Sequence, residues 1–429
     1  MFQQLKEFYL KQKTIIILTT TTLLLFFACF VEPLWWVAAA LLLLFYATCD
    51  FGEILCYIMY FNLFSRIGTF YIVSLLVAFV VCATKYVVEL VRKQRKFFTL
   101  PFVLTTLFVL IFSCVHSGFN ILGFEQGVLV IALLYVVYLA FVYKDQINVF
   151  KCFSFLALGM VVSLGLSAIT LLIKNFPFEI YHFDGTYRRL KLLCYHQNHL
   201  AMHSLFLMAY ATFLLINKQG KIWMNLGWLA IGFVLGVLTM SKAFLLVCFL
   251  LCVYVAIYLV CKFKLKSLKF IVPALLFFAV IGFIFKDFLM MIVNRFVAYN
   301  IGASFINQIT TGRSGIWFDY IMSITSSVQK VLFGVGLFGE ELIEIGCHNV
   351  LIFVIYRTGL IGLLLLGILA WSYFKESKHK IKISFKNILM LALYVILSFN
   401  EMIFSDRFFM YLIFGILLIS STQAKENLN

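Results

Sequence analysis

His348 and Asn349 stand directly before an apolar run that is long enough to cross a membrane as a helix. The first turn of such a helix carries unpaired backbone N–H groups and the positive end of the helix dipole, which attract anions. A neutral histidine, with an ordinary pKa of about 6.5, is suited to take a proton from a hydroxyl group there. The alternative is that one of these side chains only caps the helix. Both interpretations place polar groups at the start of this helix.

Arg357 lies nine residues after His348 in the same apolar run, about 13 Å further along a helix axis. A cation at that depth is costly in lipid, so we expect its side chain to face the bundle interior or a water-filled cavity. It either contacts a ligand or forms a structural ion pair. The segment between the last two apolar runs offers Glu401 and Asp406 as partners for such a pair.

The composition is that of a membrane protein. Of its 429 residues, 64% are hydrophobic and 12% are charged, whereas soluble domains have about 45–50% apolar and about 25% charged residues. The apolar residues fall in repeated runs near the roughly 20 residues that span a bilayer as a helix. We therefore predict an all-α fold, a polytopic transmembrane helix bundle that forms one integral membrane domain over residues 1–429.

The formal net charge is +16, and the basic residues behind it lie mostly on one side of the predicted membrane spans. The connections on one side, with both termini, hold 21 of the 34 Lys and Arg residues but 4 of the 18 Asp and Glu residues. Because Lys and Arg favour the cytoplasm, we predict that this side is cytoplasmic. The charge therefore reports topology and gives no support to nucleic-acid binding. Two cytoplasmic termini need an even number of spans, 12 or 14, depending on whether residues 51–64 cross or one of the first two runs does not.

Two connections on the opposite side are long enough to carry chemistry. They are residues 174–197 and residues 287–348. Backbone polar groups are not left bare in lipid, so both connections must fold over the mouth of the bundle or enter a wet cavity. Residues 318–332 have apolar positions near helical spacing, which predicts a surface helix lying on the membrane or on the bundle. We predict that 287–348 is an extracytoplasmic catalytic loop and that 174–197 is a second extracytoplasmic loop.

Basic residues on this outer side need an explanation, because the positive-inside rule keeps that side poor in Lys and Arg. They include Arg188, Arg189, Lys191 and Arg313, with Lys242 in a tight outer turn. Arginine forms forked, charge-assisted hydrogen bonds to phosphate oxygens, so a diphosphate is a suitable ligand. Solvated loop charges, a snorkelling lysine and contacts to lipid headgroups are the alternatives.

Three histidines at helical spacing follow these basic residues. His196, His199 and His203 fall on one face of a helix, which is a permissible arrangement of metal ligands. No carboxylate or cysteine nearby completes a convincing set, and the eleven cysteines show no paired CxxC spacing. We therefore favour the lining of a cavity mouth for the histidines and predict neither a metal site nor a cofactor.

The order of several short motifs resembles the O-antigen polymerase and O-antigen ligase superfamily, membrane glycosyltransferases that act on undecaprenyl-diphosphate-linked glycans. The similar pieces are Asn198 with Leu200-Ala201, Ser241-Lys242, Arg313 with Trp317, Phe333-Gly334-Val335-Gly336-Leu337, His348-Asn349, Arg357 to Leu363, and Glu401. The chain departs from the family at Lys242, where arginine is usual, and Arg357 occupies a variable position.

The resemblance implies an inverting, metal-independent transfer on the outer face of a bacterial cytoplasmic membrane. It implies His348 and Arg313 as catalytic residues. It implies that the diphosphate or glycan is bound by Arg188, Arg189, Asn198, Lys242, Asn349, Arg357 and Glu401. The implied partners are an undecaprenyl-diphosphate-linked oligosaccharide and membrane lipids, and a chain-length regulator and a flippase stay open as further partners.

The motifs do not separate the members of this superfamily by reaction. The expected activity is that of an O-antigen, capsule or exopolysaccharide polymerase, which adds a glycan to the hydroxyl of a lipid-linked repeat unit. One alternative is a ligase that moves the glycan to a lipid A core or a protein. An alternative of another class is a transporter or flippase, although the sequence has no clear inverted repeat.

Overall fold

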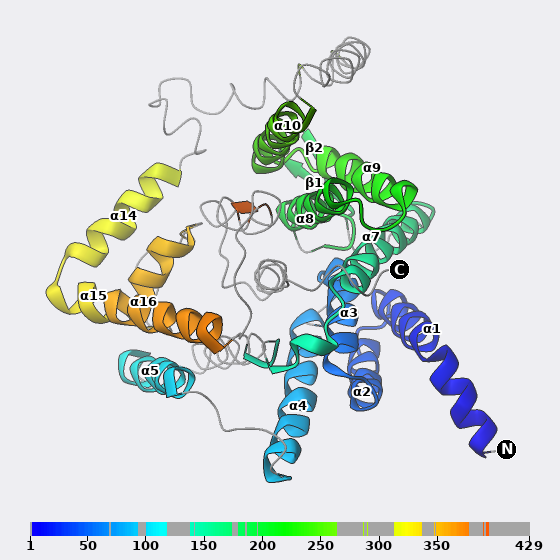
Figure 1. The fold of residues 1–429 in the computed structure, drawn as a ribbon, viewed down its shortest axis with the longest axis horizontal. Coiled ribbons are helices and arrows are strands. Elements are labelled where there is room, and N and C mark those ends of the chain that lie inside the picture. The colour runs from blue at the N-terminus through cyan, green and yellow to red at the C-terminus, as the bar shows by residue number, and fades with distance from the viewer. Residues whose placement is uncertain are drawn as a thin grey trace.

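The computed structural model of the protein describes most of the helical bundle and part of its connections (Figure 1). The described residues are 2–67, 70–92, 100–117, 138–140, 142–173, 179–184, 187–194, 196–263, 313–336 and 349–376, with the single positions 286, 290, 347, 389, 392 and 393. Their elements are α1 (Phe2–Ala28), α2 (Leu34–Ala47), α3 (Phe51–Phe61), η1 (Asn62–Phe64), α4 (Phe70–Val91), α5 (Leu100–Ser117), η2 (Lys144–Gln146), α7 (Val149–Thr170), β1 (Tyr181–Asp184), β2 (Tyr187–Leu190), α8 (Gln197–Asn217), α9 (Ile222–Leu238), α10 (Lys242–Phe263), α14 (Arg313–Thr325), α15 (Val328–Phe333) and α16 (Val350–Glu376).

Several of these helices suit a membrane by length and composition. Five described segments are long and apolar enough to cross one: Ser74–Val91, Val149–Thr170, Gln197–Asn217, Lys242–Lys262 and Leu351–Leu369. Shorter apolar helices cover Gln12–Ala28, Leu34–Ala47, Phe51–Phe64 and Ile222–Leu238. The prediction of a mainly helical membrane protein is confirmed to this extent.

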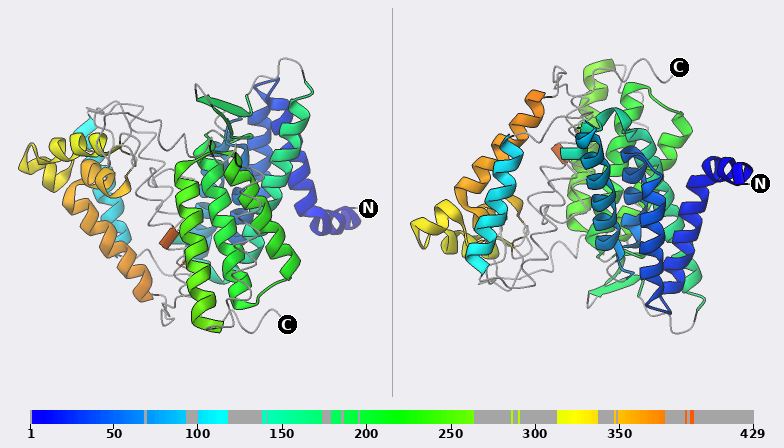
Figure 2. Two further views of the ribbon diagram at one scale, coloured as in Figure 1. Left: turned by 90° about the horizontal axis from the view of Figure 1, so that it is seen from above. Right: turned by 90° about the horizontal axis from the view of Figure 1, so that it is seen from below.

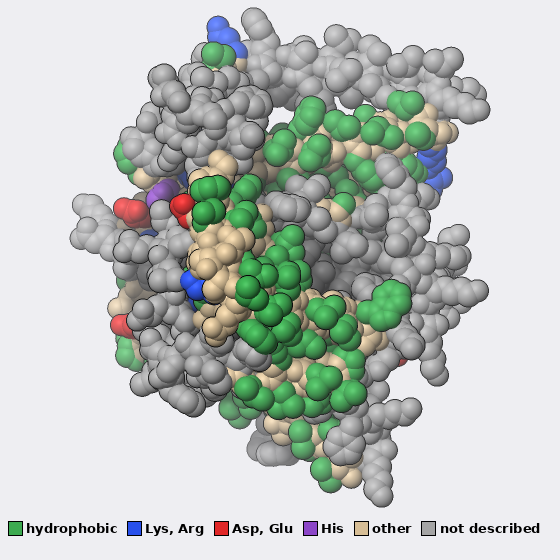
Figure 3. Space-filling view, turned by 90° about the vertical axis from the view of Figure 1, so that its left-hand side faces the viewer, with side chains coloured by type: hydrophobic (Ala, Val, Ile, Leu, Met, Phe, Trp, Pro, Cys, Tyr) green, Lys and Arg blue, Asp and Glu red, His purple; other side chains and the backbone are tan. Residues whose placement is uncertain are grey.

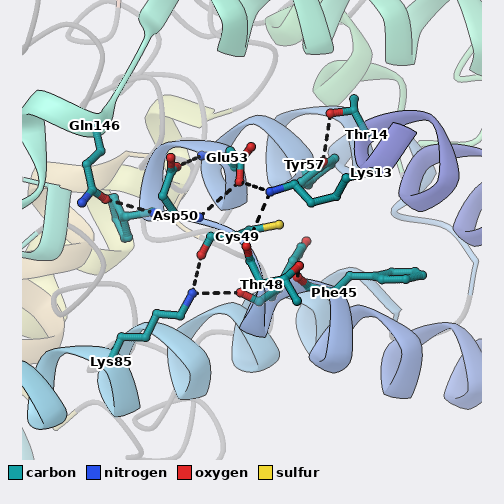
Figure 4. Close-up of polar contacts among 12 residues, drawn as sticks. Lys13, Thr14, Phe45, Thr48, Cys49, Asp50, Glu53, Tyr57, Lys85 and Gln146 are labelled. Carbon is teal, nitrogen blue, oxygen red and sulfur yellow. Dashed lines mark hydrogen bonds and ion pairs between the residues drawn. The ribbon is translucent and has the colours of Figure 1, made fainter. Parts of the chain in front are cut away.

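Helix α3 begins at a polar junction between α1, α2 and α4 (Figure 4). The Asp50 carboxylate accepts a hydrogen bond from the Glu53 backbone N–H at 2.7 Å, and the Glu53 carboxylate accepts one from the Asp50 N–H at 3.2 Å. This reciprocal capping box fixes the first turn of α3. Lys13 Nζ lies 2.6 Å from Glu53 Oε2, and Lys85 Nζ donates to the carbonyl of Cys49 just beyond α2. The two lysines therefore hold the end of α2 beside the start of α3.

The interior of the bundle is closely packed around α3, which is buried along most of its length. A Cβ added to Gly159 of α7 would come within 2.8 Å of the Tyr60 carbonyl oxygen, so these two helices touch through their backbones. The Tyr60 hydroxyl also shares a hydrogen bond of 2.8 Å with Thr22 of α1. Helix α3 thus connects α1 and α7 inside the bundle.

Helices α8, α9 and α10 form a second packed layer (Figure 1). Gly232 of α9 faces α8, where an added Cβ would meet the Ser204 carbonyl oxygen at 2.9 Å. Gly236, one turn further along α9, instead faces the ring of Phe244 in α10. These two glycines allow α9 to approach a different neighbour at each position, because neither carries a side chain.

A short β-hairpin lies at one end of this bundle (Figure 2). Strands β1 and β2 pair antiparallel, with Tyr181 opposite Leu190 and Asp184 opposite Tyr187. The sequence analysis treated residues 174–197 only as a loop and did not predict these strands. We call the end of the bundle where the hairpin, the start of α8 and the end of α9 meet the hairpin end.

Helices α14 and α15 contribute to an apolar face with α5 and α16 (Figure 3). The sequence predicted one surface helix over 318–332, but the structure has two helices. Ser327 separates them and caps α15 by accepting a hydrogen bond from the Lys330 N–H at 3.2 Å. Tyr320 of α14 is buried, whereas Phe318 and Met322 on its other side are 62% and 54% exposed. Helix α14 therefore exposes apolar side chains on the side opposite Tyr320, and its place on the membrane or on the bundle stays a prediction.

Helix α16 is interrupted at a glycine junction formed by Gly334, Gly336 and Gly359. Gly359 has φ 64° and ψ −172°, and Gly334, directly after α15, has φ 72° and ψ −166°. This backbone conformation is open essentially only to glycine. The Gly336 N–H donates to the Arg357 carbonyl at 3.0 Å, so the chain after α15 is attached to α16 at the interruption.

Candidate functional site

Arg189 is the best-defined cation at the hairpin end. It lies in β2 and is 7% exposed. Its Nε donates to the Thr239 carbonyl at 3.1 Å, and its Nη2 donates to Asn198 Oδ1 at 3.1 Å. Because Thr239 follows α9 and Asn198 lies in the first turn of α8, this one guanidinium connects the hairpin to two helices.

The turn between α9 and α10 brings Lys242 to the same end. Met240 takes a positive φ of 50°, and the Ser241 N–H donates to Thr239 Oγ1 at 3.3 Å. Lys242 is then the first residue of α10 and stands three residues after the carbonyl that Arg189 binds. Of the binding residues predicted from the sequence, the structure therefore brings Arg189 and Asn198 into contact and places Lys242 close by.

Arg188 differs from its neighbour Arg189. It is exposed on β2, opposite Phe183 of β1. Adjacent residues of a strand point to opposite faces, so one arginine enters the protein and the other faces outward. A ligand contact by Arg188 stays a prediction.

The three histidines at and after the start of α8 lie in different environments. His196 caps the helix, because its Nδ1 accepts a hydrogen bond from the Asn198 N–H at 3.2 Å. The ring centroids of His196 and His199 are 5.8 Å apart, and His203 is fully buried two turns inside. Within the part of the chain that the structure describes, no group of three or more His, Cys, Asp or Glu residues is arranged to hold a metal ion.

The hairpin end carries an excess of positive charge. Its cations come from the connection after η1, from β2 and its continuation, and from the start of α10; they are Arg66, Arg188, Arg189, Lys191 and Lys242. The first turns of α8 and α10 add the positive ends of two helix dipoles. Glu179 and Asp184 are the acids of the described hairpin region. This arrangement favours an anionic ligand.

A second group of predicted residues surrounds the start of α16. The Trp317 indole Nε1 donates to the Cys347 carbonyl at 2.9 Å, and the rings of Tyr320 and Tyr356 meet edge to face at 4.8 Å. Arg313 is the first residue of α14 and is half-buried. Helix α14 is thereby held against the residues that lead into α16.

Arg357 is enclosed by protein, with 3% of its surface exposed. Its guanidinium lies over the rings of Phe353 and Tyr356, at 5.3 Å and 5.6 Å from their centroids, and its Nη1 donates to the Gly336 carbonyl at 3.4 Å. The Gly336 N–H in turn binds the Arg357 carbonyl. Arg357 therefore takes part in the glycine junction, and a ligand contact stays a prediction.

Asn349 caps α16. It is 4% exposed, and its Oδ1 accepts a hydrogen bond from the Ile352 N–H at 3.2 Å. This is the capping interpretation that the sequence left open for the pair at this position. The remaining predicted residues, His348, Glu401 and Asp406, lie outside the described residues, as does most of the loop 287–348.

Replacing Asn349 by alanine is expected to lower the free energy of unfolding by about 1 kcal/mol, because the Ile352 N–H loses its capping acceptor. Thermal unfolding of the purified protein in detergent measures this effect. Asn349→Asp keeps an acceptor at the cap and is the matched control. Equal unfolding temperatures for the wild type and Asn349→Ala would show that this cap does not stabilise the helix.

No model of a known protein family matches the chain, and no curated protein matches it. The family resemblance therefore rests on the motif residues themselves. Catalysis and its substrates remain proposals.

Sequence reasoning missed Arg66. Its backbone N–H donates to the Leu193 carbonyl at 3.0 Å, and its guanidinium donates to the Glu179 carbonyl, so it belongs to the hairpin end. The available signal was the one that singled out Arg188, namely a basic residue on the side predicted to be extracytoplasmic. It could be applied to Arg66 only once residues 51–64 were assigned as a span.

Proposed function

We propose that this protein is a polysaccharide polymerase of a bacterial cytoplasmic membrane. It would transfer a growing glycan from undecaprenyl diphosphate to a hydroxyl of a lipid-linked repeat unit on the outer face. The observation that supports this best is Arg189, a buried guanidinium placed between the first turn of α8 and the end of α9. A preorganised cation at this position suits a departing diphosphate, which gains negative charge as the glycosidic bond breaks.

Fourteen spans fit this proposal, with both termini in the cytoplasm. What supports fourteen is the course of α3 and η1. They begin beside Lys13 and Lys85 and end, about 22 Å later, at Arg66 of the hairpin end. Residues 51–64 would then cross the membrane as a short span inside the bundle. The hairpin end would be extracytoplasmic.

In the proposed reaction the residues divide by role. Arg189 and Lys242 would hold the diphosphate where β2 meets the turn after α9, and Arg188, on the outward face of β2, would contact it from outside. Arg313 would neutralise charge that develops in the transition state, and His348 would orient or deprotonate the acceptor hydroxyl. The bond from the sugar to the diphosphate oxygen breaks, the acceptor oxygen forms the new bond, and undecaprenyl diphosphate leaves.

The remaining binding residues would act around α16 and α8. Asn198 would keep Arg189 in place, while Asn349, Arg357 and Glu401 would contact the glycan or its diphosphate. No metal or cofactor enters the proposed reaction, since cationic side chains perform the charge stabilisation. A chain-length regulator and a flippase would act before or after this step.

A transporter of lipid-linked sugars is the second candidate. The observation that favours it is the interruption of α16 at Gly359, because transporters often bind their substrates at broken helices. The ligase is a third possibility within the same chemistry. It differs from the polymerase only in the acceptor.

Purified protein supplied with undecaprenyl-diphosphate repeat units is expected to produce a ladder of longer glycans, resolved by size. Heat-denatured protein is the matched control. Glycan transferred only to an added lipid A core or protein would identify a ligase instead. Movement of intact lipid-linked units across proteoliposomes without any new glycosidic bond would contradict the polymerase and favour the transporter.

A further inference from the structure

The buried connection after β2 contacts the end of η1. In the proposed topology this is the extracytoplasmic end of α3 and η1. Residues 191–194 follow β2, and all four are at most 7% exposed. The Leu193 carbonyl accepts from the Arg66 N–H at 3.0 Å, and the Cys194 thiol lies 3.8 Å from the Leu63 carbonyl. This connection carries a charged side chain, Lys191, into a nearly closed environment.

Lys191 lacks a protein partner in the part of the chain that the structure describes. Its ammonium makes no hydrogen bond or ion pair with a described residue, although it is 7% exposed. Burial lowers the pKa of Lys191, the positive charge of Arg66 lowers it further, and Glu179 opposes both effects from a distance. The stem of Lys191 is buried while its ammonium keeps some contact with solvent, so an anion can reach the charge there and pair with it.

A fully buried amide lies at the start of η1, one residue before the Leu63 carbonyl that the Cys194 thiol approaches. Asn62 is 0% exposed, and among the described residues neither its Nδ2 nor its Oδ1 has a hydrogen-bond partner. Native proteins rarely leave such groups unsatisfied, so water or a ligand is expected there. The backbone from Asn62 to Ser65 is helical, which places Arg66 about one turn beyond the amide.

Helix α7 adds hydroxyl groups at this level. Gly159, Ser163 and Ser167 recur every four residues, and Gly159 is the position that touches α3 at Tyr60. Ser163 and Ser167 continue this face toward the hairpin end. They are 0% and 1% exposed, and neither Oγ has a hydrogen-bond partner in the part of the chain that the structure describes.

We propose that Lys191, Arg66 and Asn62 form a binding site for a phosphate-type oxyanion at the end of η1. The two cations favour a negatively charged ligand. The Asn62 amide and the serine hydroxyls supply neutral hydrogen-bond donors. The site is separate from the contacts of Arg189, which reaches α8 and α9 instead. It does not depend on the proposed polymerase reaction.

The test measures thermal unfolding of the full-length protein in a maltoside detergent. Inorganic phosphate is added in one series and phosphatidylglycerol in mixed micelles in another, at constant ionic strength with chloride. At least one probe is expected to raise the unfolding temperature. Lys191→Met is expected to weaken the apparent affinity for that probe about tenfold or more. Without either probe, the same variant should unfold at a higher temperature than the wild type, because it no longer buries a charge.

The matched control is Lys221→Gln, which removes an exposed cation at the start of α9, away from the hairpin end, and should retain the effect of the probe. Lys191→Gln serves if the methionine variant does not fold. Stabilisation by inorganic phosphate identifies a soluble phosphate as a source, and stabilisation by phosphatidylglycerol alone identifies a lipid headgroup. The proposal is overturned if neither probe stabilises the wild type, if the effect survives both Lys191 variants, or if Lys221→Gln removes it. Since the readout is binding, failure of the polymerase assay leaves this result unaffected.

Discussion

Replacing Gly334 by alanine is expected to lower the free energy of unfolding by about 3 kcal/mol or more. The residue holds φ 72° and ψ −166°, a region essentially closed to residues with a Cβ. An added Cβ would also lie 2.5 Å from the Arg357 carbonyl carbon and 2.6 Å from its oxygen. Since both atoms belong to the backbone, no side-chain movement relieves the contact. The chain after α15 would separate from α16.

Gly315 is the matched control for this variant. It lies in α14, and an added Cβ would meet no atom within 4 Å. Gly315→Ala is therefore expected to be neutral or to stabilise the helix by about 0.5–1 kcal/mol. Thermal unfolding in detergent compares the two variants, and size-exclusion chromatography shows whether each stays monodisperse. Similar unfolding temperatures for Gly334→Ala and Gly315→Ala would mean that the glycine junction does not constrain the fold.

The glycine junction also explains what sequence reasoning could not find. Apart from Arg357 and Thr358, the run from Val350 to Trp371 is apolar or glycine, so its pattern predicts one continuous span. The interruption arises because the chain after α15, more than 20 residues earlier, supplies N–H groups to the carbonyls of Tyr356 and Arg357. A contact at that sequence separation leaves no periodic signal. The three glycines can be found in the sequence, but the sequence does not show that they meet in one junction.

Helix positions within the apolar runs were easier to predict. Apolar runs of the sequence cover 198–216, 222–239 and 241–261. The structure has α8 over Gln197–Asn217, α9 over Ile222–Leu238 and α10 over Lys242–Phe263. These bounds agree because both ends of a span are set locally, by the length of the apolar run and by the polar residues beside it.

The hairpin was missed although its sequence carries a signal. Two short runs, 181–184 with Tyr181 and Phe183 and 187–190 beginning at Tyr187, are separated by Gly185 and Thr186. A two-residue connection with glycine is typical of hairpins. The basic residues of the second run drew attention to charge instead. As a result, Arg188 and Arg189 were treated as equivalent loop cations. Strand alternation predicts that they differ, but not which one is buried.

Arg189→Lys is expected to slow chain growth about 100-fold, under the proposed function, and to lower the free energy of unfolding by about 2 kcal/mol. The guanidinium reaches the Thr239 carbonyl through Nε and Asn198 Oδ1 through Nη2, each at 3.1 Å. A lysine keeps the charge, but its single compact ammonium cannot donate to the two acceptors that the planar guanidinium reaches. The hairpin would lose one of its connections to α8 and α9, and the diphosphate would lose a preorganised donor.

Arg188→Lys makes the same chemical change one residue earlier, at an exposed position. Its stability is expected to stay within about 0.5 kcal/mol of the wild type. Thermal unfolding separates the two variants first, and the glycan ladder is then measured well below both unfolding temperatures. If folded Arg189→Lys extends glycans at the wild-type rate, Arg189 only connects the hairpin to the helices. Loss of chain growth in the folded variant instead assigns its guanidinium to the leaving diphosphate, since the net charge at the hairpin end is the same in both proteins.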